Sequence, residues 1–581
     1  MKQSLFFTAL ASGVVALLSI GIGGFFWISS QSPLSLLGGG TTNTPAAAIF
    51  VSKQAPAMVS LLVNPDKLES LRQLVTRPSD RRQSRQELER FKSSLLDTSS
   101  LDYHQDVQPW LGEEVTLAVT SSDIDRDATN GNQPGYLTIL TSKNSAKSRE
   151  FLQLLFSQRA IAGRDLVSET YQGVNIFSDC HRIDLEAHGC APLQDRTRLV
   201  GAAVGDRFIL FANHPKVLRE AINNVQAPDL SLNNSTQYQH ALSLLPTERI
   251  GIVFLNLPQA IDWLGKEPPE RIYDSQIIAL KLNPQGIVAE TSIIAAQTEL
   301  APAGTMLSEP VQALQYLPTA TNLAIAGLDL SHLQNTNLNQ LWRQITTVLS
   351  GSTNDAISRL ITQPLAMFQE SWGIDISQDI FSWVQGEYAL GMLPQKDASM
   401  TADWIFVAEK SEGTDLAIAR FNAIAAEKGL SITPLSSNEQ KIYAWTQVNT
   451  VPFNPSEPAD RSLLTLKAKV QGVYTSVDKY EIFTSSVAAM DAALKAAKSS
   501  SLLKSSQFQS AIKAIPQPNQ GYLYLDLPKS REILERQLPL LKLLEVAGKP
   551  LFEKARSLSV SSYGDRADML QGSIFLRLSS Q

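Results

Sequence analysis

Four residues that could bind a metal or form a disulfide occur together in the segment SDCHRIDLEAHGCAP. Cys180, His181, His188 and Cys190 fall within eleven residues. Two thiolates and two imidazoles can hold Zn²⁺ in a tetrahedral site, and the cysteines could also remain free thiols. We predict a disulfide between the two cysteines, because we expect this part of the chain in an oxidising compartment.

A second candidate for chemistry is a pair of Gly-Glu motifs, Gly112-Glu113 and Gly386-Glu387. Paired carboxylates can act as general acid and base in a hydrolase, but no nearby residue in the sequence supplies a further acid, a base or a metal ligand. We interpret both glycines as turns that lead into a strand. The sequence has no phosphate loop and no Gly-x-Ser-x-Gly, His-Glu-x-x-His or Cys-x-x-Cys motif, so it predicts no enzyme and no cofactor.

Two further segments are candidates for a partner or lipid surface. Residues 77–92 form a charged helix in our interpretation, and residues 531–555 contain a dense leucine run. The candidate contact residues are Arg77, Arg81, Arg82, Arg85, Leu538, Leu540, Leu541, Leu543 and Leu544. The arginines could contact anionic lipid headgroups or an acidic partner, or form a solvated face. The leucines could form core or a docking surface.

The N-terminal segment is long and apolar enough to predict a membrane anchor. Residues 5–28 contain no charge and no proline, and such a helix would span about 36 Å against a hydrocarbon core of about 30 Å. Lys2 precedes the span, and the next basic residue is Lys53. The positive-inside rule therefore predicts a cytoplasmic N-terminus and a bulk in the periplasm or thylakoid lumen. A cleaved signal peptide is the alternative.

The chain also matches itself at a spacing of 270 residues. STQYQHALSLLPTERIGIVFLNLP (235–258) and SSQFQSAIKAIPQPNQGYLYLDLP (505–528) are identical at nine of 24 positions. This similarity predicts an internal duplication. The first copy should contain a helix over 237–245 that ends before a proline, and an alternating strand over 251–257.

These patterns predict an α+β fold in four parts. Residues 1–28 form the transmembrane anchor and 29–48 a flexible linker, followed by repeat A over 49–300 and repeat B over 301–581. We expect each repeat to be a mostly antiparallel sheet with helices packed on one face. In repeat A, strands are expected near 57–63, 114–120, 136–141, 165–177, 199–212, 250–256, 277–282 and 286–296. The turn at Gly205-Asp206 favours an antiparallel hairpin.

Three segments carry a resemblance to a known family. They are PAMVSLLVNPDKL (56–68), PWLGEEVTLAV (109–119) and the G-x-x-x-L-[ND]-L-P motif of each repeat, and the apolar N-terminus accompanies them. The chain resembles a cyanobacterial membrane-anchored family, domain of unknown function 3352, over nearly its whole length. The resemblance implies attachment to a membrane of cyanobacterial cells, such as the thylakoid, and it implies no activity or cofactor.

Composition narrows the classes of function. The chain has 581 residues, 43% hydrophobic and 18% charged, with a net charge of −6, so it can bury large cores and lacks the basic surface of a nucleic-acid-binding protein. We expect a non-catalytic, membrane-anchored, extracytoplasmic binding or scaffold protein that aids assembly or maintenance of membrane complexes, with a membrane protein or lipid as partner. The alternative is a carrier or sensor of an apolar ligand in an α+β cavity. A hydrolase is the less favoured third reading.

Overall fold

The computed structural model describes about three fifths of the chain, in two compact units. The described residues are 44–64, 103–127, 132–180, 199–245, 248–263, 273–283, 285–295, 305–331, 381–394, 402–452, 464–530, 555–564, 566 and 568–578. The first unit is Met1–Leu300 with Val546–Lys554 and Ser579–Gln581, and the second is Ala301–Glu545 with Ala555–Leu578.

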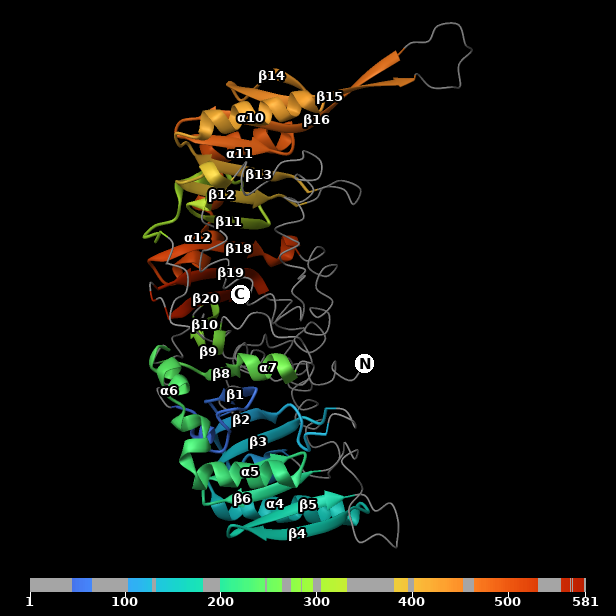
Figure 1. The fold of residues 1–581 in the computed structure, drawn as a ribbon, viewed down its shortest axis with the longest axis vertical. Helices are drawn as coiled ribbons and strands as arrows, with labels where there is room; N and C mark the ends of the chain where they lie inside the picture. The colour runs from blue at the N-terminus through green and yellow to red at the C-terminus, as the bar shows by residue number, and fades with distance from the viewer. Residues whose placement is uncertain are drawn as a thin grey trace. The chain divides into compact units, whose positions relative to one another are not determined.

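The first unit contains an antiparallel sheet in the strand order β4-β5-β6-β7-β3-β2-β1-β8-β9-β10 (Figure 1). The strands are β1 (Ala57–Leu61), β2 (Leu111–Ser121), β3 (Gly135–Ser142), β4 (Asp165–Tyr171), β5 (Val174–Cys180), β6 (Val200–Val204), β7 (Phe208–Ala212), β8 (Gly251–Asn256), β9 (Tyr273–Asn283) and β10 (Gly286–Ala295). These positions agree with the expected strands, including the hairpin between β6 and β7. The expected strand over 165–177 is two strands joined by a tight turn.

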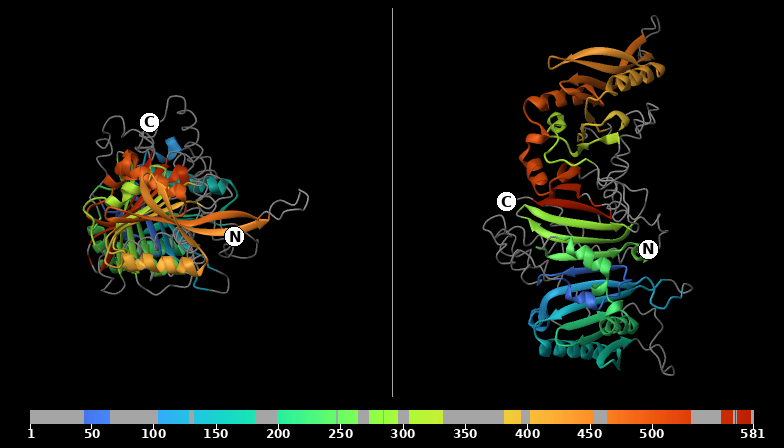
Figure 2. Two further views of the ribbon diagram at one scale, coloured as in Figure 1. Left: turned by 90° about the horizontal axis from the view of Figure 1, so that it is seen from above. Right: turned by 60° about the vertical axis from the view of Figure 1, so that its left-hand side comes forward.

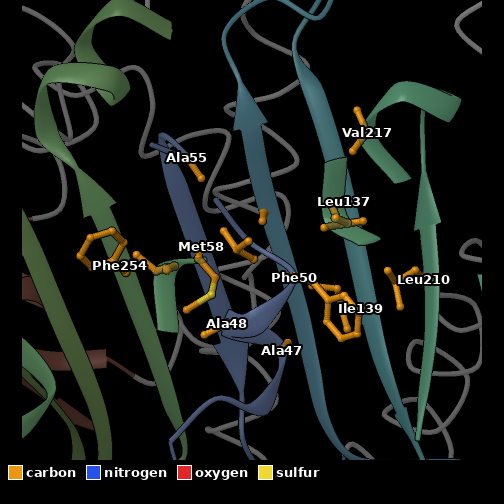
Figure 3. Packing of buried hydrophobic residues seen from close by; sticks show 14 of the residues in the cluster. Ala47, Ala48, Phe50, Ala55, Met58, Leu137, Ile139, Leu210, Val217 and Phe254 are labelled. Carbon is orange, nitrogen blue, oxygen red and sulfur yellow. The ribbon is translucent and has the colours of Figure 1, made fainter. Parts of the chain in front are cut away.

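Helices cover both faces of this sheet. They are α4 (Ser145–Ile161), α5 (Pro215–Gln226), α6 (Thr236–Ser243) and α7 (Leu257–Trp263), with short helices η2 (Ala46–Ile49), η3 (Tyr103–Val107), η4 (Pro228–Leu230) and η5 (Leu232–Asn234). Ile209 of β7 packs in a cluster with Phe151 of α4, whereas its neighbour Leu210 packs in another cluster with Val217 of α5 (Figure 3). Because successive strand residues point to opposite faces, α4 and α5 lie on opposite sides. The expectation of helices on one face is wrong.

The second unit repeats this strand order as β14-β15-β16-β17-β13-β12-β11-β18-β19-β20. The strands are β11 (Leu323–Leu328), β12 (Glu387–Met392), β13 (Trp404–Glu409), β14 (Ser431–Ser437), β15 (Gln440–Pro452), β16 (Leu464–Val477), β17 (Tyr480–Thr484), β18 (Asn519–Asp526), β19 (Ala555–Tyr563) and β20 (Met569–Leu578). The helices are α10 (Thr414–Glu427), α11 (Val487–Lys498), α12 (Ser506–Lys513), η6 (Gln312–Tyr316), η9 (Phe381–Trp383) and η10 (Leu502–Lys504). Seen along the stack of strands, α10 and α11 cover opposite faces (Figure 2).

Individual contacts also recur in the two units. Phe50 packs edge-to-face on Phe208 with ring centroids 4.9 Å apart, and Tyr316 packs in the same way on Tyr480 at 5.6 Å. The segments that matched in sequence form α6 and β8 in one unit and α12 and β18 in the other. A serine hydroxyl accepts a backbone N–H at the start of both helices, which is the usual role of serine at a helix N-terminus.

The predicted fold class needs correction. Among the residues that the structure describes, 44% are in strands and 31% in helices, so sheet is the main component. No helix in the described part of the chain is long and apolar enough to cross a membrane. The longest, α4, has 17 residues and contains Arg149, Glu150 and Arg159, which charge it too strongly for that role. The segment 5–28, for which the anchor was predicted, lies outside the described residues.

β15 and β16 extend well beyond the strands beside them. β14 pairs with β15 up to Thr446, and β17 pairs with β16 from Val473 onward. Beyond those points, residues 447–452 pair with 464–469 and with no other strand of the described residues, and this two-stranded arm projects from the sheet (Figure 1). In the first unit, the corresponding strands are shorter. β5 ends at Cys180 and β6 begins at Val200, so the cysteine-containing segment stands in sequence where the second unit has the arm.

Candidate functional site

The Gly-Glu motif of the first unit places a buried carboxylate against the start of a short helix. Glu114 of β2 is 8% exposed. Its Oε2 accepts the N–H of Ala46 at 2.8 Å, its Oε1 accepts the N–H of Ala47 at 2.9 Å, and the Thr116 hydroxyl donates to Oε1 at 3.1 Å. The first N–H groups of a helix have no partner inside it. Glu114 therefore caps η2 and joins it to the sheet.

The second unit uses Glu387 at the start of β12 in the same way. Its Oε2 accepts the N–H of Ala313 in η6 at 3.2 Å and the hydroxyl proton of Tyr480 at 2.5 Å. The Glu387 N–H donates to Glu409 Oε2 at 3.0 Å, and Glu409 Oε1 contacts Lys479 Nζ at 3.0 Å. Burial, followed by the bond to Glu387, raises the pKa of Tyr480. Burial acts against ionisation of Glu409, but the Glu387 N–H and the Lys479 ammonium lower its pKa.

The structure changes which glutamates correspond in the two motifs. β2 has an irregular register against β3 between Leu111 and Val115, and this bulge contains one residue more than the start of β12. The extra residue is the exposed Glu113, so Glu114 is the counterpart of Glu387. The interpretation of Gly112 as a turn is also wrong, because Gly112 lies within β2.

The glycine of each motif is required by a close neighbour. A Cβ on Gly112 would lie 2.5 Å from Thr141 Oγ1 and 2.9 Å from the Thr141 carbonyl oxygen, and one on Gly386 would lie 2.6 Å from Glu409 Oε2. Both motifs therefore have a structural role: the glycine admits the adjacent strand and the glutamate caps a helix. The described residues also contain no group of three or more His, Cys, Asp or Glu side chains that could hold a metal ion.

One end of the first unit's sheet, formed by the edge strand β4 together with α4 and called the outer end because β4 is an edge strand, is the most exposed part of that sheet among the described residues. Ile161, the last residue of α4, is 87% exposed, and Leu166 and Val167 of β4 are 42% and 46% exposed. Glu169 of β4 makes a two-bond ion pair with Arg219 of α5 at 2.8 and 2.9 Å. β4 is thus held in place from within the unit, while its apolar side chains face solvent.

The outer end of the second unit, formed by α10 and β14, has the same character. Leu416 of α10 is 76% exposed, and Ile432 and Leu435 of β14 are 41% and 37% exposed. Gly163 and Gly429, both with positive φ, end the corresponding helices two residues before β4 and β14 begin. Counting from these glycines, Ile432 stands where Leu166 stands in the first unit.

Exposed apolar residues are concentrated at these two ends. Of the eleven large apolar residues that are exposed in the described part of the chain, four lie on α4 and β4 and three on α10 and β14. A single exposed leucine or valine is ordinary, and Leu166 and Val167 point to opposite faces of β4, so they do not form one patch. What distinguishes these residues is that exposed apolar side chains recur at the same end of both sheets. The outer ends are therefore the candidate functional site.

Comparison with known proteins gives the family. Residues 10–578 match the family described as "Protein of unknown function (DUF3352)", which is nearly the whole chain. The chain belongs to this family. The predicted family is thus confirmed, and the cyanobacterial source stays a prediction.

Other comparisons add little to the DUF3352 assignment. No curated protein matches the chain. Crystal form I of TP0453 is 8% identical, covering 44% of this chain and 81% of that chain with a TM-score of 0.24. Crystal form III of TP0453 is 10% identical, covering 44% and 82% with a TM-score of 0.24. Scores this low carry no argument about fold or function.

The segments that carried the DUF3352 resemblance are core elements. PAMVSLLVNPDKL contains β1, PWLGEEVTLAV contains most of β2, and the paired motifs contain β8 and β18. They account for the sheet and for the Glu114 cap. They contain no residue of the outer ends.

Most of the site residues predicted from sequence lie outside the described residues. This holds for Cys190, both histidines beside it, and the candidate arginines and leucines. Cys180 is the last residue of β5, and no disulfide is found in the described part of the chain. The outer ends were missed because an exposed leucine or valine in a short strand reads in sequence as a core residue.

Proposed function

We propose that this DUF3352 protein is a non-catalytic binding or scaffold protein that contacts a partner protein through the outer ends of its two units. The observation that carries the proposal is the exposure of Ile161, Leu166 and Val167 on α4 and β4, with its counterpart on α10 and β14. Full burial of an exposed large apolar side chain contributes roughly 1.5–3 kcal/mol, which applies nearly in full to Ile161, 87% exposed, and to about half that extent to Leu166 and Val167.

The chemistry of β4 favours a protein partner over an anionic lipid surface. The strand carries two carboxylates, Asp165 and Glu169, and no basic residue. Membrane-surface segments normally attract anionic lipid through Lys and Arg, and β4 itself offers neither, while Arg219 of α5 is engaged by Glu169. Ser168 supplies a hydroxyl next to Val167, and interfaces between proteins combine such polar groups with apolar ones.

Site-specific photo-crosslinking in cells tests this proposal. A photoreactive residue replaces Ile161 or Leu416 in the full chain, and a third variant carries it at Val225, which is exposed on α5 at 37%. We expect the same crosslinked protein from positions 161 and 416 and none from 225. Crosslinks from position 225 that equal those from the outer ends would contradict the proposal.

A location outside the cytoplasm and a disulfide between Cys180 and Cys190 are part of the same proposal. The distribution of Lys2 and Lys53 around residues 5–28 supports a location outside the cytoplasm, which a reporter fused to the C-terminus tests. Asp179 brings the two ends of the cysteine-containing segment together, because its N–H bonds the Leu199 carbonyl at 3.1 Å and its Oδ1 accepts the Leu199 N–H at 2.6 Å. Intact mass with and without reductant tests the disulfide.

A further inference from the structure

A buried carboxylate lies on the face of the second unit's sheet that α10 covers. Glu481 of β17 is 4% exposed. Phe483, two residues further along the strand, packs edge-to-face on Phe421 of α10 with ring centroids 5.9 Å apart. Because residues two apart in a strand point to the same side, Glu481 lies on the α10 side as well. An ionised carboxylate is costly to bury unless it is paired and hydrogen-bonded.

The first unit has an apolar residue at the matching position. Tyr480 is the counterpart of Phe208 in the repeated aromatic contacts, so Glu481 is the counterpart of Ile209. Ile209 is 1% exposed and packs in the apolar cluster that includes Phe151 of α4. The fold therefore does not require a carboxylate at this position.

The Glu481 carboxylate has little compensation in the second unit. Its Oε1 is 3.9 Å from Lys410 Nζ, which is beyond hydrogen-bond distance. Its Oε2 is buried and has no hydrogen-bond partner in the part of the chain that the structure describes. Lys410 Nζ donates instead to the carbonyl oxygen of Asp478 at 2.7 Å. The residues paired with Glu481 in the adjoining strands, Ala408 and Ser476, add no charge.

The surroundings of Glu481 favour its protonated form. Burial, the largest effect, raises its pKa above the ordinary value of 4.5. The Ser476 hydroxyl and the Lys410 ammonium act in the opposite direction, and the Asp415 carboxylate in the first turn of α10 adds to the rise. The titratable side chains on the adjoining parts of β13, β16, β17 and α10 are Glu409, Lys410, Glu412, Asp415, Tyr474, Asp478 and Lys479.

The remaining members of this group do not neutralise Glu481. Glu409 and Lys479 pair with each other at 3.0 Å. Burial raises the pKa of Tyr474 above its ordinary value of 10, and the carboxylate of Glu481 raises it further, so Tyr474 is uncharged at acidic and neutral pH.

We propose that Glu481 is a pH-sensitive switch that controls how firmly α10 is held on its sheet. The helix stays closed while the carboxyl is protonated, and it opens more often once the carboxyl ionises, because the charged form gains from contact with water. α10 carries Leu416, so the switch would also regulate the outer end of the second unit as a binding surface. This last step rests on the proposed function.

A raised pKa means that α10 opens more easily as pH rises. Below pH 4.5 the carboxyl is protonated in both the closed and the open state, so pH has no effect through this group. Between 4.5 and the pKa of the closed state, opening releases a proton, and the open fraction rises by up to about tenfold per pH unit. Above that range the change is complete.

Amide hydrogen exchange of the full chain at several pH values tests the switch. Exchange is expressed as a protection factor, which removes the intrinsic pH dependence, and α4, which packs on Ile209, is the control within the same molecule. We expect protection of α10, but not of α4, to fall with rising pH. Glu481→Gln and Glu481→Ile should keep α10 protected at every pH. Glu412→Gln, which changes an exposed residue just before α10, should behave as the wild type.

Two further variants distinguish a switch from a packing role. Lys410→Met removes the nearby cation, so the pH range in which α10 loses protection should extend to higher pH. Asp415→Asn removes a like charge, so the same range should end at lower pH. A side chain that acts only through packing would not respond in opposite directions to these two changes.

Protection of α10 that is independent of pH in the wild type, or equally dependent on pH in Glu481→Gln, would overturn the inference. Crosslinking from position 416 in cell lysates should weaken with rising pH in the wild type and not in Glu481→Gln. If α10 follows pH but this crosslinking does not, the regulatory step fails. Absence of crosslinks from both positions 161 and 416 at every pH would instead contradict the proposed function, and α10 exchange would still decide the switch.

Discussion

Replacing Glu114 with alanine should destabilise the first unit, because it removes the cap of η2. The wild-type carboxylate accepts the N–H groups of Ala46 and Ala47 at 2.8 and 2.9 Å and the Thr116 hydroxyl at 3.1 Å. Hydrogen bonds to a charged group contribute about 1.5–3 kcal/mol each, and an unpaired buried donor costs about 1–3 kcal/mol. Since the three bonds share one carboxylate, we expect a combined loss of about 3 kcal/mol rather than their sum.

The neighbouring residue provides a matched control. Glu113 is exposed in the bulge, so Glu113→Ala should change the free energy of unfolding by no more than about 0.5 kcal/mol. Urea unfolding of the full chain compares the two variants. Amide exchange of a peptide covering Ala46 and Ala47 locates the loss, because exchange there should accelerate only when Glu114 is replaced. Equal losses from the two variants, or unchanged exchange at η2 without Glu114, would refute the capping role.

Three further predictions concern the buried polar groups and the close contacts of the first unit. Burial raises the pKa of Glu114 in the folded chain above its ordinary value of 4.5. At pH values between the pKa of the unfolded chain and that of the folded chain, folding therefore takes up a proton. The free energy of unfolding falls as pH rises through this range. Urea midpoints measured from below pH 4.5 to neutral should show a steeper decline in the wild type than in Glu114→Gln. Gly112→Ala should cost about 1–3 kcal/mol, because its Cβ would meet the Thr141 carbonyl oxygen at 2.9 Å; a thermal melt unchanged by this substitution would contradict the required close approach. Asp179→Ala removes the buried carboxylate that Arg159 contacts at 2.5 Å and should cost about 3 kcal/mol, with faster proteolysis after β5 as the local readout.

The positions of the strands could be predicted from sequence because alternation and turn residues act locally. The hairpin at Gly205-Asp206 and the strand before Pro258 are where the pattern placed them. The coverage of both sheet faces could not be predicted in this way. A strand with helices on both faces, such as β7 with Ile209 and Leu210 both buried, reads simply as an apolar run.

A comparison of the two repeats in sequence could not predict which glutamate caps a helix. Two sequences align by residue type, so Gly112-Glu113 matched Gly386-Glu387, but the bulge in β2 moves Glu114 to the position that Glu387 occupies. The outer ends were missed for another reason. Leu166, Val167 and Ile432 are apolar residues of short strands, which read in sequence as core, and only the paired strands show that they lie at an exposed end of the sheet.

Amide hydrogen exchange on the full chain, alone and in complex with the protein that crosslinks to position 161, tests the central claim most directly. We predict that exchange slows on complex formation in peptides covering β4 and the end of α4, with no change in β9 and β10. Slowed exchange in other segments while β4 and α4 remain unchanged would contradict the assignment of the outer end as the binding surface.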